Sequence, residues 1–131
     1  MDSAFQRIHH PTDRGYSATV VAPLGSHSLV YVSGEVGRNE AGVVVAQEFE
    51  AEARQCFTNL QTALRRGGAS FKHVVKITIF LKDLADYPVY AKVRTEFCGE
   101  DWPAGTCVGV ANLLLGAKIE VDAVAVVPTG A

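Results

Sequence analysis

The sequence predicts a single α+β domain in which two helices cover one face of a β-sheet. Its 131 residues suit one domain of ordinary size, and an apolar fraction of 48% supplies enough surface for a core. The hydrophobic period changes along the chain between that of strands and that of helices, in the order β-β-β-α-β-α-β-β. We therefore treat residues 1–131 as one domain.

The N-terminal part of the chain carries three short strand-like segments. Each contains β-branched or aromatic residues and is bounded by turn formers. The three segments are residues 5–9, 17–23 and 28–33. Residues 11–15 and 38–42 are typical of loops, and Gly25-Ser26-His27 is typical of a hairpin turn.

Helical spacing begins at Gln47. From there apolar residues recur every three or four positions, and charged residues occupy the positions between them. The apolar set is Phe49, Ala53, Cys56, Phe57, Leu60 and Leu64, and the charged set is Glu48, Glu50, Glu52, Arg54, Arg65 and Arg66. The acidic residues come first and the arginines last, which suits the helix dipole, and Gly67-Gly68 is expected to end the helix.

A fourth strand is predicted over residues 73–82, where apolar residues alternate with others. Asp86 is expected to cap a second helix, with Pro88 in its first turn and its end near Gly99. The last two predicted strands are residues 105–110 and 118–127.

The final strand predicts that the protein self-associates. Ile119 and Val121 would face the helices, whereas Val124 and Val126 would face the other way, together with Phe80 of the predicted fourth strand. Because two helices cover only one face, these residues would remain in water unless another copy buried them. We therefore expect an oligomer of identical chains.

Composition argues against nucleic-acid and membrane partners. The formal net charge is −2, and the only basic doublet, Arg65-Arg66, lies at the expected end of a helix. No apolar run approaches the roughly 20 residues that span a bilayer, and the N-terminus lacks the apolar stretch of a signal peptide. The 3 cysteines form neither a disulfide framework nor a zinc pair, so a cytoplasmic protein is expected.

General catalytic motifs are missing from the sequence. There is no G-x-S-x-G elbow, no phosphate-binding loop and no H-E-x-x-H zinc motif. The segment at residues 34–37, GEVG, lacks the lysine and following helix of a phosphate loop, so we interpret it as a turn at a strand end. His9-His10, His27 and His73 lie on separate elements, so we interpret them as surface or turn residues and predict no metal or cofactor.

Two residues have both a chemical and a structural interpretation. Glu120 is a carboxylate in an otherwise apolar strand; in a cleft between subunits its pKa would rise and it could hold a water or move a proton. Alternatively it is a solvated or ion-paired strand residue. Cys107 is most simply a small core residue, since no base or cation is identifiable beside it.

Four segments share their pattern with one known family. They are YVSGEVG (residues 31–37), VVKITIFLKDLADY (residues 74–87), WPAGTCVGVANL (residues 102–113) and KIEVDAVAVV (residues 118–127). Together they resemble the Rid family, the YjgF-type reactive-intermediate deaminases, in order and spacing from Tyr16 to Val127. The resemblance implies a fold like that of homotrimeric chorismate mutase, with small-molecule clefts between the three subunits.

The resemblance also implies an activity and a site. Archetypal members hydrolyse imines and enamines derived from amino acids, which releases ammonia and a 2-oxo acid. The site positions carried over are Tyr16 in the first loop, Ser33 and Gly34 after the third strand, and Cys107 and Glu120 in the last two strands. By this resemblance Glu120 would position the hydrolytic water.

The chain departs from the family at one position. The family has an arginine two residues before the cysteine, where it holds the substrate carboxylate, and this chain has Gly105. Loss of such a fork costs about 2–5 kcal/mol of binding, so activity on small 2-imino acids is expected to be weak. Arg14 is either a replacement for this arginine or a solvated loop residue.

Two functions of different classes follow from this reading. The first is a Rid-like hydrolase or deaminase that acts on an imine, an enamine or a related substrate, with specificity altered by Gly105. The alternative is a non-catalytic protein that binds a ligand or regulates a partner. Ribonuclease activity, a third possibility that the resemblance raises, is disfavoured by the acidic charge balance and by the lack of an aromatic and basic surface.

Overall fold

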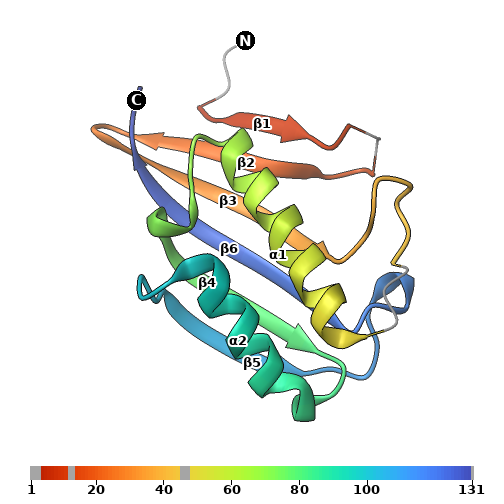
Figure 1. Ribbon diagram of the computed structural model, residues 1–131. Helices are drawn as coiled ribbons and strands as arrows, with labels where there is room; N and C mark the ends of the chain where they lie inside the picture. Colours follow the sequence, from red (N-terminus) through yellow and green to blue (C-terminus); the bar gives the residue numbers. More distant parts are fainter. Residues whose placement is uncertain (1–3, 12–13, 45–47, 131) are drawn as a thin grey trace.

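A six-stranded sheet forms the framework of the computed structural model, which describes residues 4–11, 14–44 and 48–130. The strands are β1 (Gln6–His9), β2 (Ser17–Leu24), β3 (His27–Val36), β4 (Val74–Leu81), β5 (Ala104–Gly109) and β6 (Ile119–Pro128). Their order across the sheet is β1-β2-β3-β6-β4-β5, and only the β4–β5 pair is parallel (Figure 1). The C-terminal strand therefore lies at the centre, between strands from both halves of the chain.

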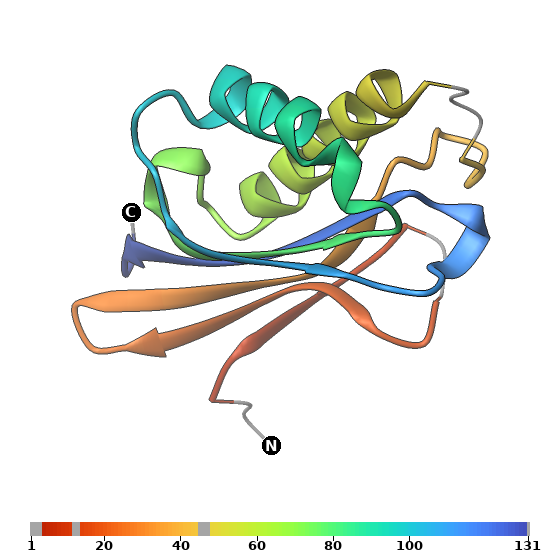
Figure 2. The same ribbon diagram turned by 90° about the horizontal axis from the view of Figure 1, so that it is seen from below.

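Two helices lie side by side on one face of this sheet (Figure 2). They are α1 (Phe49–Arg66) and α2 (Tyr87–Cys98), and three short 3₁₀ turns, η1 (Phe71–His73), η2 (Leu84–Asp86) and η3 (Leu114–Gly116), connect other elements. The predicted α+β class, the element order and the helices on a single face are confirmed. We call the sheet face away from the helices the open face.

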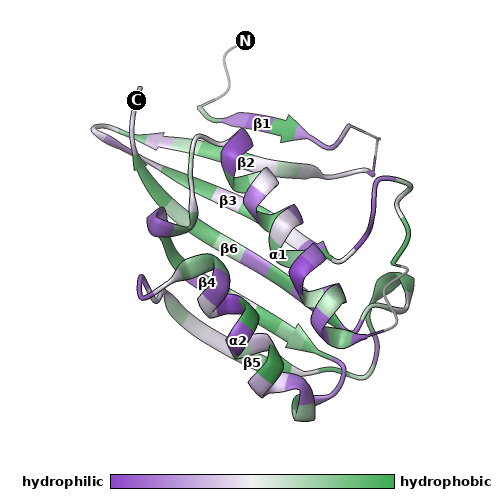
Figure 3. Ribbon diagram, viewed as in Figure 1, coloured by the Kyte–Doolittle hydropathy of each residue, from purple (hydrophilic) through white to green (hydrophobic). Residues whose placement is uncertain are grey.

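The core lies between the helices and the central strands. Phe57 of α1 is fully buried, and its ring centroid lies 5.5 Å from that of Phe97, 5.9 Å from that of Phe71 and 6.1 Å from that of Tyr90. Figure 3 shows hydrophobic residues concentrated along β3, β6 and β4, beneath α1 and α2. The apolar positions predicted for the first helix thus do form its buried side.

The place of Glu52 among the charged positions predicted that it would lie on the solvent side of α1, and this prediction was wrong. It is 1% exposed, and its Oε2 accepts a hydrogen bond of 2.6 Å from the backbone N–H of Lys118. The buried carboxylate thus gains a partner at the start of β6, which offsets part of the cost of its desolvation. Gly37 allows the close approach of this turn of the helix, since an added Cβ would lie 2.6 Å from the carbonyl oxygen of Glu52.

Two local predictions were wrong. The segment at residues 34–37 is not a strand-end turn, because β3 continues to Val36 and pairs with β6 after a register shift between Val32 and Glu35. Asp86 makes no side-chain cap bond; instead Asp83 accepts a hydrogen bond from the backbone N–H of Ala85 and caps the preceding η2 turn. The chain enters α2 directly from this turn, so no separate cap forms there.

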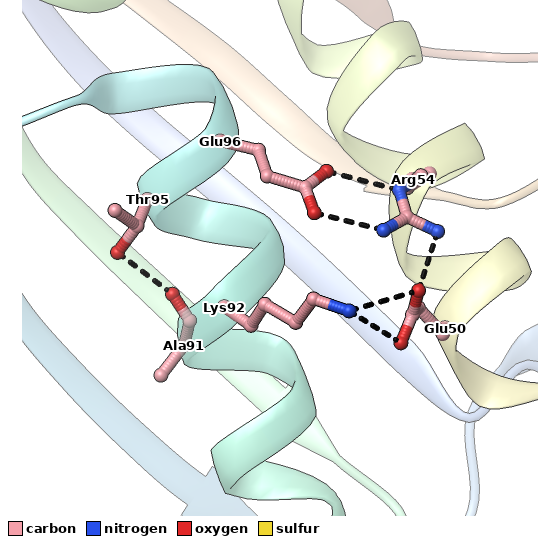
Figure 4. A network of polar contacts seen from close by, with 6 residues as sticks. All are labelled: Glu50, Arg54, Ala91, Lys92, Thr95 and Glu96. Carbon is pink, nitrogen blue, oxygen red and sulfur yellow. Dashed lines mark hydrogen bonds and ion pairs between the residues drawn. The ribbon is translucent and has the colours of Figure 1, made fainter.

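Ion pairs join the two helices on their outer surface (Figure 4). Arg54 of α1 lies 2.6 Å from Glu50, one helical turn away, and 2.8 Å from Glu96 of α2. Lys92 of α2 lies 3.2 Å from the other Glu50 oxygen. Since all four side chains are partly exposed, the network fixes how the helices sit side by side more than it stabilises the fold.

The open face carries no helix. Along β6 the residues that point toward it, Glu120, Asp122, Val124 and Val126, are all half-buried, and so is Phe80 of β4. Tyr31 of β3, the strand partner of Val124, is 46% exposed. Within the described part of the chain, no helix is long and apolar enough to cross a membrane.

Candidate functional site

A pocket of about 310 Å³ opens at the end of β3, on the open face. It is lined by Tyr16, Ser33, Gly34, Val36, Arg38, Leu114 and Glu120, and we call it the Glu120 pocket. Four of the residues predicted for a site therefore meet here: Tyr16 from the first loop, Ser33 and Gly34 from β3, and Glu120 from β6.

The absence of a side chain at Gly34 lets the Glu120 carboxylate lie against the backbone of β3. An added Cβ at Gly34 would collide with a carboxylate oxygen of Glu120, and the Glu120 carboxyl carbon would be only 2.9 Å from it. The two strands are in register here, with Val36 opposite Glu120. Any larger residue at position 34 would push the carboxylate out of the pocket.

The surroundings of Glu120 make its carboxylate more ready to take up a proton than a carboxylate in water. Burial raises the pKa of Glu120 above its ordinary value, the negative charge of Asp122 adds to the rise, and Arg38 opposes it. A carboxylate with a raised pKa is a stronger base than one in water. Glu120 is thus suited to take a proton from a bound water molecule.

Tyr16 and Arg38 form the polar wall of the same pocket. The Nη2 of Arg38 donates to the Tyr16 hydroxyl over 3.5 Å. Ser33 Oγ donates to the backbone carbonyl of Ser17 over 2.6 Å, which ties β3 to the start of β2 and leaves its lone pairs for a ligand. Sequence reasoning missed Arg38 as a site residue; its one signal was its position directly after Gly37.

Gly105 and Cys107 lie elsewhere, in a pocket of about 290 Å³ between β5 and α2. We call this the Gly105 pocket; its other lining side chains include those of Tyr87, Tyr90, Arg94 and Trp102. The guanidinium carbon of Arg94 lies 5.3 Å from the ring centroid of Tyr90. A cation therefore lines the same pocket as Gly105.

The Cys107 thiol is not activated in this pocket. Burial raises the pKa of Cys107 above its ordinary value, so the thiol is protonated at neutral pH. At Gly105 the backbone would accept a side chain, because the nearest atom to an added Cβ is Ile77 Cγ2 at 3.6 Å, an ordinary contact. Glycine at this position leaves space in the pocket, although the backbone conformation does not require a glycine.

The two pockets lie on opposite faces of the sheet. In the parallel pair β4–β5, Gly105 lies opposite the buried Ile77 and so faces the helices. Glu120 lies opposite Phe80, which points to the open face. Within one chain, therefore, Gly105 and Cys107 do not join the Glu120 pocket, and only a second copy could bring a Gly105 pocket to it.

Arg14 contacts neither of these pockets. Its Nη1 lies 3.2 Å from Nδ1 of His10, in a third pocket on the helix side of the sheet. His10 was predicted to be a surface or turn residue; it does not lie on the surface, since it is 8% exposed. Burial first, and then the nearby arginines, lower the pKa of His10 to about 4, so its ring is neutral at pH 7.

The other histidines are placed as the sequence indicated. His9 and His27 are exposed, and His73 closes the η1 turn by accepting a hydrogen bond of 3.0 Å from the backbone N–H of Ser70. Among the described residues, no three His, Cys, Asp or Glu side chains are grouped so that they could hold a metal ion.

The comparisons with known proteins identify the family. The family model described as Endoribonuclease L-PSP matches residues 7–127. A 2-iminobutanoate/2-iminopropanoate deaminase of Dermatophagoides farinae is 34% identical over 113 residues, which cover 80% of this chain and 88% of that protein. The protein of the same name from Bos taurus is 34% identical over 118 residues, which cover 84% of this chain and 86% of its own.

Solved structures agree with the sequence comparisons. Yeast Mmf1 superposes with a TM-score of 0.83 at 26% identity, covering 93% of this chain and 98% of that one. The YjgF gene product of E. coli superposes with a TM-score of 0.75 at 31% identity, covering 88% of this chain and 91% of that one. The fold, the match along nearly the whole chain and these relatives together place the chain in the Rid family, the YjgF-type proteins.

Proposed function

We propose that this protein hydrolyses imines or enamines and that Glu120 activates the water. The observation that carries the proposal is the Glu120 carboxylate, which is half-buried against Gly34, has a raised pKa and faces a pocket with a tyrosine and an arginine. The deaminase names of the relatives support the same reaction class.

The proposed reaction needs one base that returns its proton. Glu120 takes a proton from water as the water oxygen bonds to the carbon of the protonated imine, which gives a neutral carbinolamine. The protonated Glu120 then gives its proton to the nitrogen. As the C–N bond breaks and a C=O bond forms, Glu120 takes the proton of the hydroxyl group, and the departing ammonia carries this proton away as ammonium. An enamine must first be protonated at carbon to become an imine. A carboxyl group with a pKa above its ordinary value suits both transfers near neutral pH.

Arg38 and Tyr16 would hold the substrate beside Glu120. The Arg38 guanidinium is a donor for a substrate carboxylate or a carbonyl oxygen, and Tyr16 adds a hydroxyl. Arg38 already contacts Tyr16, however, so it offers fewer free donors than an arginine reserved for a bidentate carboxylate. We therefore propose that the substrate is not a small 2-imino acid, which depends on that contact for most of its binding.

A second copy of the chain would complete the site. We propose a homotrimer in which the open face is buried and the Gly105 pocket of one subunit lies against the Glu120 pocket of the next. The partly buried apolar residues of the open face support this arrangement. The space beside Gly105, with Tyr87 and Trp102 at its border, would then accommodate a larger, apolar substituent.

Ammonia release from a panel of substrates tests this function. The panel comprises 2-imino acids with small and bulky side chains, generated in solution by an amino-acid oxidase, together with enamines and lactams. We expect turnover of at least one bulky imine or enamine. Glu120→Gln should lower that turnover by at least about 100-fold, because the amide cannot accept the proton from water.

Asp122→Asn is the matched control for this variant. Asp122 is the next residue on the same strand face, and it lies outside the Glu120 pocket. Its loss should change turnover by less than about threefold, since it acts on Glu120 only through its charge. Ligand binding without ammonia release from any substrate would overturn the proposed hydrolysis and favour a non-catalytic binding protein.

A further inference from the structure

A third pocket lies on the helix side of the sheet, between the first loop, the end of β3 and α1. It has a volume of about 300 Å³, and we call it the arginine pocket. The charged or titratable side chains that line it are His10, Arg14, Glu35, Arg38, Glu40 and Arg66. Arg38 lies between this pocket and the Glu120 pocket and lines both, whereas the other five line only this one.

Two buried N–H groups in the arginine pocket have no acceptor among the described residues. The Arg14 guanidinium donates to His10 Nδ1, so the neutral ring carries its proton on Nε2. This Nε2–H has no hydrogen-bond partner and is shielded from water, since His10 is only 8% exposed. The Nε–H of Arg38 is buried and unpartnered in the same way. Buried donors without acceptors are costly, and each would be satisfied by a ligand oxygen.

The charge of the pocket selects the kind of oxygen. Three arginines and two glutamates line it, and His10 is neutral because its pKa is lowered to about 4. The lining charge is therefore +1 with both glutamates ionised. Burial raises the pKa of Glu35 to about 7, against the opposing effect of the arginines, so at neutral pH Glu35 is partly protonated and the lining charge lies between +1 and +2. A positive pocket with unpaired donors favours an anion over a neutral or cationic ligand.

The backbone at Arg38 is held in place before any ligand binds. The side-chain amide of Asn59 donates to the backbone carbonyls of Val36 and Arg38, over 2.8 and 2.9 Å. Asn59 itself receives a hydrogen bond of 2.8 Å from Gln55, one turn earlier on α1. This chain of bonds joins the loop that carries Arg38 to the helix that carries Arg66. A backbone held in this way reduces the entropy that the loop loses when the Arg38 side chain binds a ligand.

We propose that the arginine pocket binds a small oxyanion, a carboxylate or phosphate group, whose oxygens accept from His10 Nε2–H and Arg38 Nε–H while Arg14 and Arg66 balance its charge. The site is separate from the Glu120 pocket and needs no turnover. Because Arg38 lines both pockets, an anion here would also hold Arg38 in place beside Tyr16.

Isothermal titration calorimetry on the whole protein tests the proposal, with pyruvate and inorganic phosphate as separate probes at constant ionic strength. We expect saturable binding of at least one probe at pH 6, and the stronger one identifies the group that the pocket accepts. Arg66→Gln should weaken this binding about tenfold, because it removes one charge-assisted contact. Arg65→Gln is the matched control, because Arg65 is the neighbouring exposed arginine and does not line the pocket. The affinity of this variant for the probe should stay within about twofold of the wild-type affinity.

The pH dependence of binding supplies a second, independent readout. The charged groups that face Glu35 are Arg14, Arg38 and Arg66, with Glu120 on the far side of the sheet. As Glu35 ionises through a pKa of about 7, it repels a bound anion, so the affinity for pyruvate, whose own charge is constant in this range, should fall between pH 6 and pH 8. Glu35→Gln should remove most of this fall while the protein remains folded.

Three results would overturn the proposal. One is the lack of saturable binding of both probes at pH 6. Another is equal weakening by Arg66→Gln and Arg65→Gln, which would mean general attraction to a basic helix end. The third is a pH dependence that persists in Glu35→Gln. None of these results bears on ammonia release, so the arginine pocket and the proposed hydrolysis fail independently.

Discussion

The two faces of β6 differ sharply, although their residues alternate along one strand. Ile119, Val121 and Ala125 face the helices and are fully buried, and Ala123 is 2% exposed. Glu120, Asp122, Val124 and Val126 face away from them and are only half-buried. The first face is a finished core, whereas the second combines apolar residues with two carboxylates and remains partly open in a single chain. The same strand therefore serves stability on one side and, in our proposal, chemistry on the other.

The two faces of the sheet also differ in the surroundings of the carboxylate that each one carries. Glu52, on the helix side, is buried and bonded to the backbone N–H of Lys118, so its role is structural. Glu120, on the open face, lines a pocket, and burial and Asp122 raise its pKa. A buried carboxylate that is held by a backbone donor stabilises the fold, whereas one that faces a cavity remains available for a ligand.

The largest expected effect separates the two faces directly. Val121→Asp places a charge without a partner under the helices and should lower the free energy of unfolding by at least about 4 kcal/mol. The measurement is urea denaturation followed by circular dichroism. A loss below about 1 kcal/mol would show that the helix-covered face is far less closed than its burial indicates.

The matched variant three residues along should act on assembly instead. Val124 is half-buried on the open face, so Val124→Asp should leave the secondary structure intact while it disrupts the proposed trimer. Light scattering at micromolar concentration should report a trimer for the wild type and a smaller species for Val124→Asp. A stable wild-type monomer would contradict self-association, and a dimer would contradict the trimeric arrangement.

A smaller effect is expected from placing a second cation in the Gly105 pocket, beside Arg94. Gly105→Arg should raise the rate of ammonia release from 2-iminopropanoate by about tenfold or more, because a bidentate guanidinium would bind the small carboxylate. The backbone accepts this change, since an added Cβ meets only Ile77 Cγ2 at 3.6 Å. Gly105→Ala, which adds a Cβ without a charge, is the control and should show no such gain. Wild-type turnover that already equals that of an arginine-bearing relative would mean that another cation binds the carboxylate, with Arg38, Arg94 and Arg14 as the candidates.

The smallest effect is expected on the outer surface of the helices. Arg54→Ala removes the contacts to Glu50 and Glu96 (Figure 4), and should lower the stability of the fold only slightly, because exposed ion pairs are screened by water and salt. Thermal unfolding at low and high salt measures it, and the difference between variant and wild type should shrink at high salt. A loss of stability as large as that of Val121→Asp would mean that the network holds the helices together rather than merely aligning them.

Local periodicity determined most of the fold from the sequence. The alternation of β6, the apolar side of α1 and the element order follow from which neighbouring residues share a face, and the structure confirms them. The isolated carboxylate at Glu120 was also visible as a break in an apolar strand. The register shift in β3 was not, because a bulge depends on how two strands pair rather than on either strand alone.

The tertiary structure alone decided which distant residues meet. Tyr16, Gly34 and Glu120 come together because β3 pairs with β6. Gly105 and Cys107 fall on the other face because the register of the β4–β5 pair sets them opposite the buried Ile77 and Ile79. The burial of His10 and Glu35, and with it their shifted pKa values, likewise depends on what covers them. Desolvation and charge act through space. The periodicity of a sequence therefore reveals its strands and helices, but the register of the strands and the course of the loops decide where the pockets form.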